Sequence, residues 1–235
     1  MAKSMDARLL AAQVAIDNAL NNADVQTYLA GYGYDSTRLN EGKTLLAAAQ
    51  QLHQKQTAEY GEQFAATTAL QSAWEQADAE YMRCVKVARV ALKSDRSADQ
   101  KLALDGKRKV TISGWIVQAK QFYANALTDA SILAKLMQYG ITQQKLQAGQ
   151  QQVAQVESAN IAQKKEKGEA QQATQERDAA IEKLDDWVSD FIAIARVALE
   201  EKPQLLEKLG ILEATPGVSR PRTKKAPVDS EPAEA

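Results

Sequence analysis

The sequence predicts an all-α fold: a tandem duplicated helical bundle with two very long helices, each preceded by a shorter helix in an αα-hairpin. Three observations support this prediction. Ala and Gln are abundant among the 235 residues, β-branched runs are almost absent, and Gly and Pro are scarce before residue 210, which favours helix. Apolar residues recur with a helical period, and similar segments recur at one fixed spacing. We expect the bundle to be elongated and coiled-coil-like.

The internal repeat relates residues that lie 107 positions apart, as Asn18 and Asn125 do. The segment NALNNADVQTYLAGYG begins at the first of these residues and resembles NALTDASILAKLMQYG, which begins at the second. Further along, EYGE matches EKGE, and ARVAL recurs unchanged at the same spacing. Because chance similarity between Ala-rich helices would not keep one offset without insertions, we interpret the chain as a duplication.

The repeat divides the chain into three parts. Residues 1–110 form the first helical repeat and residues 111–212 the second, and we expect the two to build one pseudo-twofold unit. Residues 213–235 contain four of the five prolines and lack apolar periodicity, so we expect this C-terminal tail to be disordered.

Helical periodicity predicts one short and one long helix in each repeat. Neither long segment contains a break signal, and a heptad of positions can be followed along each without a change of phase. Each long helix would therefore contain about 55 to 60 residues and measure about 85 Å. Two further short helices, starting near Ser97 and Lys202, follow the long ones. The four main helices are expected at approximately residues 6–30, 36–94, 111–138 and 146–198.

The glycine-rich stretch GYGYDSTRLNEG has the composition of a phosphate-binding loop, but the repeat argues against that function. Its second copy, QYGITQQKLQAG, lacks the first glycine, and neither copy follows a predicted strand, as such loops usually do. Gly33 and Gly140 stand where a left-handed residue ends a helix. Asp35 and Thr142 are good N-caps for the next helix. We therefore predict a helix–helix turn in each copy.

The middle of each long helix is polar and contains one glycine, Gly61 in the first and Gly168 in the second. A glycine inside a helix costs about 1 kcal/mol relative to alanine, so its presence in both copies indicates a close helix approach or a local bend. We expect the long helices to run antiparallel and to cross near these glycines, with one short helix packed at each end. In the alternative arrangement, each long helix bends sharply at its glycine and forms a three-helix bundle with its own repeat.

Chemistry that needs several histidines or cysteines is excluded, because the chain contains one of each, His53 and Cys84. We predict no catalytic residue and no cofactor, and we interpret Cys84 as a small buried hydrophobe. A group of carboxylates near the expected crossing could hold a hard cation; the alternative is a solvated face balanced by nearby lysines. The candidate ligands are Glu59, Glu62, Glu166 and Glu169.

The sequence indicates a cytoplasmic protein without a transmembrane segment, since it has no signal-peptide pattern and no long apolar run. A net charge of −1 leaves no global field that would attract nucleic acid, so no specific nucleic-acid binding is expected. We expect a non-enzymatic helical scaffold or protein-interaction protein, with a protein partner or self-association. Two alternatives stay open: a helical protein in peripheral contact with a membrane surface, and a bundle that binds an apolar ligand or a metal.

Overall fold

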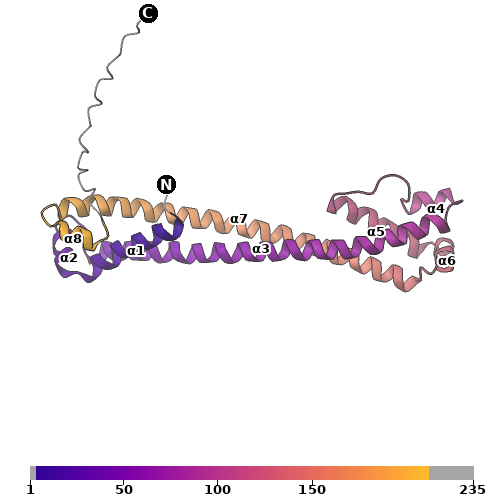
Figure 1. Ribbon diagram of the computed structural model, residues 1–235, viewed down its shortest axis with the longest axis horizontal. Helices are drawn as coiled ribbons and strands as arrows, with labels where there is room; N and C mark the ends of the chain where they lie inside the picture. Colours follow the sequence, from indigo (N-terminus) through magenta and orange to yellow (C-terminus); the bar gives the residue numbers. More distant parts are fainter. Residues whose placement is uncertain (1–3, 212–235) are drawn as a thin grey trace, which may run out of the picture. The chain divides into compact units, whose positions relative to one another are not determined.

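The computed structural model describes residues 4–211, which form eight α-helices and no strands (Figure 1). The tail that the sequence predicts to be disordered, residues 213–235, lies outside the described residues. The helices are α1 (Met5–Asn21), α2 (Ala23–Ala30), α3 (Ser36–Ala91), α4 (Arg96–Lys101), α5 (Ile112–Thr128), α6 (Ala130–Gln138), α7 (Gln143–Ala198) and α8 (Pro203–Lys208).

The structure confirms the all-α fold and the two long helices, since α3 and α7 each continue for 56 residues. The prediction of one helix at residues 6–30 and one at residues 111–138 is wrong, because each of these two segments forms two helices. Asn22 has an extended backbone between α1 and α2, and its side chain accepts hydrogen bonds from two N–H groups of α2. Asp129 does the same between α5 and α6. A residue that caps a new helix cannot keep helical backbone angles, so it also ends the helix before it.

The turns before α3 and α7 are built alike. Gly33 and Gly140 have positive φ angles of 81° and 77°, a conformation that glycine adopts without steric strain. The Asp35 carboxylate accepts a hydrogen bond of 2.9 Å from the backbone N–H three residues later, and the Thr142 hydroxyl accepts the equivalent bond at 3.3 Å. These four residues therefore end one helix and start the next, in the roles that the sequence assigns to them.

The described chain forms two compact units that do not coincide with the two repeats. The first unit combines residues 4–46 with residues 184–211, and the second unit contains residues 47–183. Each unit therefore joins the short helices of one repeat to the end of the long helix of the other repeat. A separate three-helix bundle for each repeat would not mix the segments in this way.

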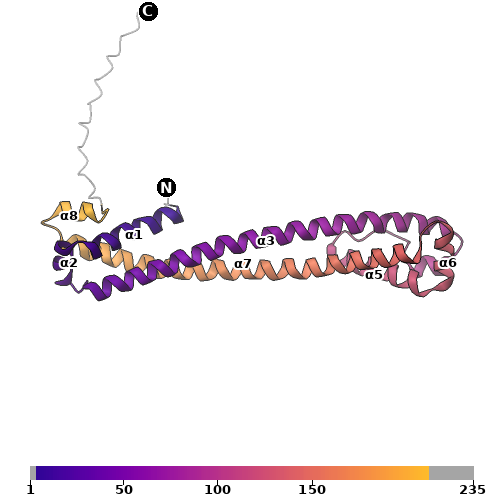
Figure 2. The same ribbon diagram turned by 90° about the horizontal axis from the view of Figure 1, so that it is seen from below.

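In the second unit, Tyr81 of α3 belongs to a buried aromatic cluster. Its ring centroid lies 5.9 Å from that of Trp115 and 5.5 Å from that of Phe122, both on α5, and the ring planes are nearly perpendicular, as aromatic pairs prefer. Within this unit α3 and α7 lie side by side (Figures 1 and 2), and they add Leu70 and Val153 to the same core. Thus α5 of the second repeat covers the end of α3 from the first.

In the first unit, a different set of aromatic side chains fills the core. Trp187 and Phe191 of α7 stack with 5.3 Å between their ring centroids, and Tyr34 lies 5.7 Å and 5.4 Å from them. Helix α1 contributes the small side chains Ala15 and Ala19 to this core. The relation between repeats is therefore the same as in the second unit, since α1 of the first repeat covers the end of α7 from the second.

Polar contacts also recur at the 107-residue spacing, and two residues related by it are called counterparts below. Asn125 Nδ2 donates a hydrogen bond of 2.6 Å to the backbone oxygen of Lys101 in the second unit. Its counterpart Asn18 donates one of 2.5 Å to the backbone oxygen of Lys208, the counterpart of Lys101, in the first unit. The same hydrogen bond therefore fixes the chain after each long helix to the short helix beside it.

A second recurring contact has kept one partner and changed the other. Trp115 Nε1 donates a hydrogen bond of 2.7 Å to the Asp78 carboxylate in the second unit. In the first unit, the counterparts Arg8 and Asp185 form an ion pair. An aspartate on the long helix thus receives a donor from the short helix in both units, although the donor is an indole in one and a guanidinium in the other.

A close helix approach at Gly61 and Gly168, one of the two explanations that the sequence suggested, is not found. A Cβ atom added to either glycine would have no neighbouring heavy atom within 4 Å. Both positions lie inside continuous helices. The lack of a side chain at these two positions is therefore not required by the packing.

The close approaches lie instead at Gly42 of α3 and Gly149 of α7. A Cβ atom at Gly42 would overlap the ring of Trp187, and one at Gly149 would overlap the ring of Tyr123. These two glycines are counterparts, and each lets a large aromatic side chain of its own unit pack against a helix backbone. Nothing in the sequence distinguishes these two glycines, because both occupy ordinary heptad positions.

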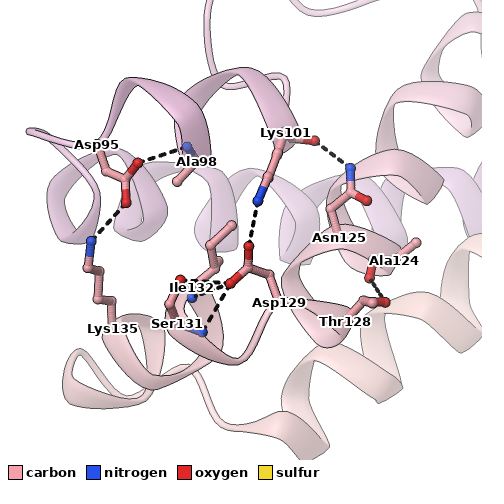
Figure 3. A network of polar contacts seen from close by, with 10 residues as sticks. All are labelled: Asp95, Ala98, Lys101, Ala124, Asn125, Thr128, Asp129, Ser131, Ile132 and Lys135. Atoms are coloured by element: carbon pink, nitrogen blue, oxygen red, sulfur yellow. Dashed lines mark hydrogen bonds and ion pairs between the residues drawn. The ribbon is translucent and has the colours of Figure 1, made fainter.

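A network of polar groups joins α4 to α5 and α6 in the second unit (Figure 3). The Asp129 carboxylate accepts a hydrogen bond of 2.8 Å from Lys101 Nζ, and bonds of 3.0 and 3.2 Å from two backbone N–H groups of α6. These donors, above all Lys101, hold the pKa of Asp129 well below its ordinary value. Lys135 Nζ donates to Asp95 at 2.8 Å and lowers the pKa of that carboxyl as well.

Replacing Gly149 with alanine is expected to destabilise the protein by about 1 to 3 kcal/mol, the usual cost of overpacking, because the methyl group would overlap the Tyr123 ring. Gly168→Ala in the same helix is the matched control. It is expected to stabilise the protein by about 0.5 to 1 kcal/mol, since its Cβ atom has room. Urea unfolding followed by circular dichroism measures both changes. An equal loss of stability in the two variants would contradict this packing.

Asp129→Asn is expected to lower the free energy of unfolding at neutral pH and to make that free energy less dependent on pH in the acidic range. Because folding depresses the pKa of Asp129, the carboxylate stabilises the fold above its unfolded-state pKa of about 3.9 and loses this effect as the pH falls below that value. Asparagine keeps a capping oxygen, as Asn22 does, but not the charge. The urea midpoints of the two proteins should therefore converge on acidification. A gap that is independent of pH would argue against the ion pair.

Candidate functional site

Three of the four candidate metal ligands meet between α3 and α7 in the second unit. One carboxylate oxygen from each of Glu59, Glu166 and Glu169 lies within 4.8 Å of the other two. Glu59 and Glu166 are half-buried, whereas the Glu169 side chain is 43% exposed. The fourth candidate, Glu62, is exposed and lies outside this group. The three that meet are called the acidic trio below.

Lysine side chains supply the opposite charge at the acidic trio. Lys165 Nζ donates to Glu169 at 2.7 Å and to Glu166 at 3.2 Å. Glu169 and then Glu166 raise the pKa of Lys165, and Lys165 in turn lowers the pKa of Glu169. Lys55 bonds to Glu176 at 2.8 Å, and its charge adds to the lowering of the Glu169 pKa.

The acidic trio has the chemistry of a weak site for a hard cation, because Ca²⁺ and Mg²⁺ prefer carboxylate oxygens. One of its oxygens, Glu166 Oε2, is buried and accepts no hydrogen bond from the described residues. The Lys165 ammonium, however, already donates to two of the three carboxylates. The geometry therefore favours the interpretation as a balanced polar cluster over that of a metal centre.

A pocket of about 570 Å³ opens in the first unit between α2 and the residues around α8. Its volume is within the range of small-molecule sites. The lining is mixed in charge, with Lys202 and Lys208 beside Asp24 and Glu201, and with the ring of Tyr28. Sequence reasoning missed this pocket because its residues come from two distant segments and form no motif.

Two ion pairs lie at the corresponding junction of the second unit. Lys101 pairs with Asp129 and Lys135 pairs with Asp95, each at 2.8 Å (Figure 3). Neither ion pair can form in the first unit, because its members are replaced by residues that do not carry opposite charges. The counterparts of Lys101 and Asp129 are Lys208 and Asn22. Those of Lys135 and Asp95 are Tyr28 and Lys202. The pocket of the first unit is thus found where the second unit uses two ion pairs.

Three pairs of large apolar side chains are exposed at counterpart positions, and they are called the exposed apolar pairs below. Each pair has one member in each compact unit. Every member exposes more than half of its surface, which is high for such residues. They are Leu10 (61%) with Val117 (67%), Tyr32 (52%) with Tyr139 (53%), and Val197 (55%) with Val90 (61%).

Cys84 is buried in the core of the second unit, which confirms its interpretation as a small hydrophobe. Burial raises the pKa of its thiol. A nucleophilic cysteine needs the opposite shift, because the thiolate is the reactive form.

Comparison of the chain with protein-family models, with curated proteins and with solved structures finds no match. None of the helices in residues 4–211 is both long enough and apolar enough to cross a bilayer.

Lys165→Met is expected to make the melting temperature respond to Ca²⁺ or Mn²⁺, because it removes the ammonium group that balances the acidic trio. Lys164→Met is the matched control, since Lys164 is the neighbouring exposed lysine. Circular dichroism melting with and without the cation, at about 1 mM as weak carboxylate sites require, measures the response. A clear shift in the unaltered protein would show instead that the trio holds a metal with Lys165 in place.

Proposed function

We propose that the protein is a non-enzymatic helical interaction protein that binds a protein partner or a second copy of itself. The observation that carries this proposal is the recurrence of the exposed apolar pairs in both compact units. Each unit then presents the same three kinds of side chain on equivalent elements. These are α1 or α5, the turn before a long helix, and the end of a long helix.

The internal repeat allows a comparison that supports this proposal. The aligned repeats share only about a quarter of their residues, so most of their positions have diverged. Two of the exposed apolar pairs nevertheless consist of identical residues, Tyr32 with Tyr139 and Val90 with Val197. The third pair, Leu10 with Val117, keeps its apolar character. None of the six is needed for the core, since all are exposed.

The physical chemistry of these side chains also suits an interface. An exposed apolar side chain gains free energy when a partner removes it from water, and tyrosine is enriched at protein interfaces. Two equivalent sets of exposed side chains on one chain would let one partner bind twice, which strengthens binding without a new kind of contact.

Photo-crosslinking in the native host tests the proposal. A benzophenone amino acid replaces Tyr32 in one protein and Tyr139 in another. A third protein carries it in place of Phe64, an aromatic residue that is 75% exposed but whose counterpart is Gln171. Positions 32 and 139 are expected to give the same protein adduct, and position 64 is not.

Mass spectrometry of the adducts distinguishes the possible occupants. Another protein at both positions, or a second copy of this chain, would support the proposal. Adducts with lipid alone would point to the membrane-surface alternative and would contradict it. The same adducts from all three positions would show that the exposed apolar pairs are not special, and would contradict it as well.

A further inference from the structure

A second hollow of the first unit is a groove of about 380 Å³ between α1, α7 and the chain after α8. Small and aliphatic side chains make up much of its lining, and two arginines and one aspartate also take part. Ile211, the last described residue, lies at the groove. The lining residues include Arg8, Ala11, Ala15, Asp185, Val188 and Arg196.

The corresponding surface of the second unit is covered by the connector between α4 and α5, residues 105–111. Arg108 Nη1 donates to the hydroxyl of Tyr81 at 2.9 Å, and Tyr81 is the counterpart of Val188 in the groove. The backbone N–H of Lys109 donates to Gln118 Oε1 at 3.1 Å, and Gln118 is the counterpart of Ala11. The connector therefore lies on the residues that correspond to the groove.

The counterparts of connector residues 105–111 are residues 212–218, LEATPGV, which follow directly after Ile211. They lie outside the described residues. The segment begins at the groove, because Ile211 lines it, so the segment can follow the path that residues 105–111 take in the second unit.

The side chains of the groove are smaller than those of the second unit. Ala15 stands in place of Phe122, and Val188 in place of Tyr81. The segment differs from the connector in polarity, because Leu212 replaces the connector's Asp105. Similarly, Ala214 replaces Lys107 and Val218 replaces Thr111. The segment thus has apolar side chains where the connector has polar ones, beside a groove whose side chains are smaller and largely apolar.

Charge changes in the same complementary way. Arg8, Arg196 and Asp185 give the groove a net charge of +1, while the segment carries one acidic residue, Glu213, and no basic residue. Opposite charges at a partly shielded surface attract one another.

We propose that residues 212–218 occupy this groove and complete the first unit, as residues 105–111 complete the second. The occupant is a segment of the same chain. Leu212 fills apolar volume beside Ala15 and Val188, and Glu213 faces the arginines. Only the residues from Ser219 onwards then lead away from the unit, which shortens the tail that the sequence predicts to be disordered.

Cysteine cross-linking in the full chain tests this proposal. The first protein carries Ala11→Cys and Pro216→Cys, because the counterparts of these residues are in hydrogen-bond contact in the second unit. The matched control carries Val14→Cys and Pro216→Cys. Val14 lies on the same helix and close to Gly210, but it does not line the groove. Cys84 stays in both proteins because it is buried, and melting curves show that both fold.

A short bis-maleimide is expected to link positions 11 and 216 within one chain at least about tenfold faster than positions 14 and 216, because docking raises the effective concentration at one position only. Leu212→Ser should reduce that rate several-fold, whereas Val228→Ser, further along the tail, should not. Equal rates for the two cysteine pairs would overturn the proposal, since an undocked segment reaches both positions alike. Links between two chains would also overturn it, because the groove would then hold a second copy.

Discussion

The fold depends on one packing relation: the short helices of each repeat cover the end of the long helix of the other repeat. Tyr81 illustrates the constraint, because its ring has no exposed surface although it lies on a helix that is polar over much of its length. Trp115 and Phe122 of the other repeat enclose it. Burying one such side chain contributes roughly 1.5 to 3 kcal/mol. A hairpin of two long helices could not supply that burial from its own residues, so neither repeat can complete its core alone.

Because each unit combines short helices of one repeat with a long helix of the other, the two units have the same framework but different surfaces. The hydrogen bonds of Asn18 and Asn125 are equivalent, and so are the glycine turns. The second unit has two ion pairs and the contacts of its connector at places where the first unit lacks them. The first unit has alanines, lysines and arginines at the counterpart positions, and there the two hollows are found. Specialisation for binding is therefore expected mainly in the first unit, whereas the exposed apolar pairs are common to both.

The middle of the long helices holds a cluster of opposite charges rather than a metal or catalytic centre. Three carboxylates approach one another there, but Lys165 binds two of them. The sequence could place three of these glutamates together because the four form two counterpart pairs, Glu59 with Glu166 and Glu62 with Glu169, on two helices that were expected to cross. It could not exclude Glu62, since the side on which a residue of one helix faces the other depends on the rotation of both helices. The same uncertainty explains why no close helix approach is found at Gly61 and Gly168. Gly42 and Gly149 could not be singled out from the sequence, because the aromatic rings that pack against them come from residues far away in the chain.

By itself the sequence determined the helical class, the two long helices and the turns at Gly33 and Gly140, and its similar segments recur at a spacing of 107 residues. These features follow from local physics: helix propensity, apolar periodicity, and the need for a glycine where φ is positive. The breaks at Asn22 and Asp129 were also encoded locally, as N-caps, but a helix-favouring context concealed them. Tertiary structure decided which repeat completes which core, which glycines allow contact, and where hollows stay open. Those outcomes depend on side chains that are far apart in the chain and meet only after packing, and no local pattern records their distance.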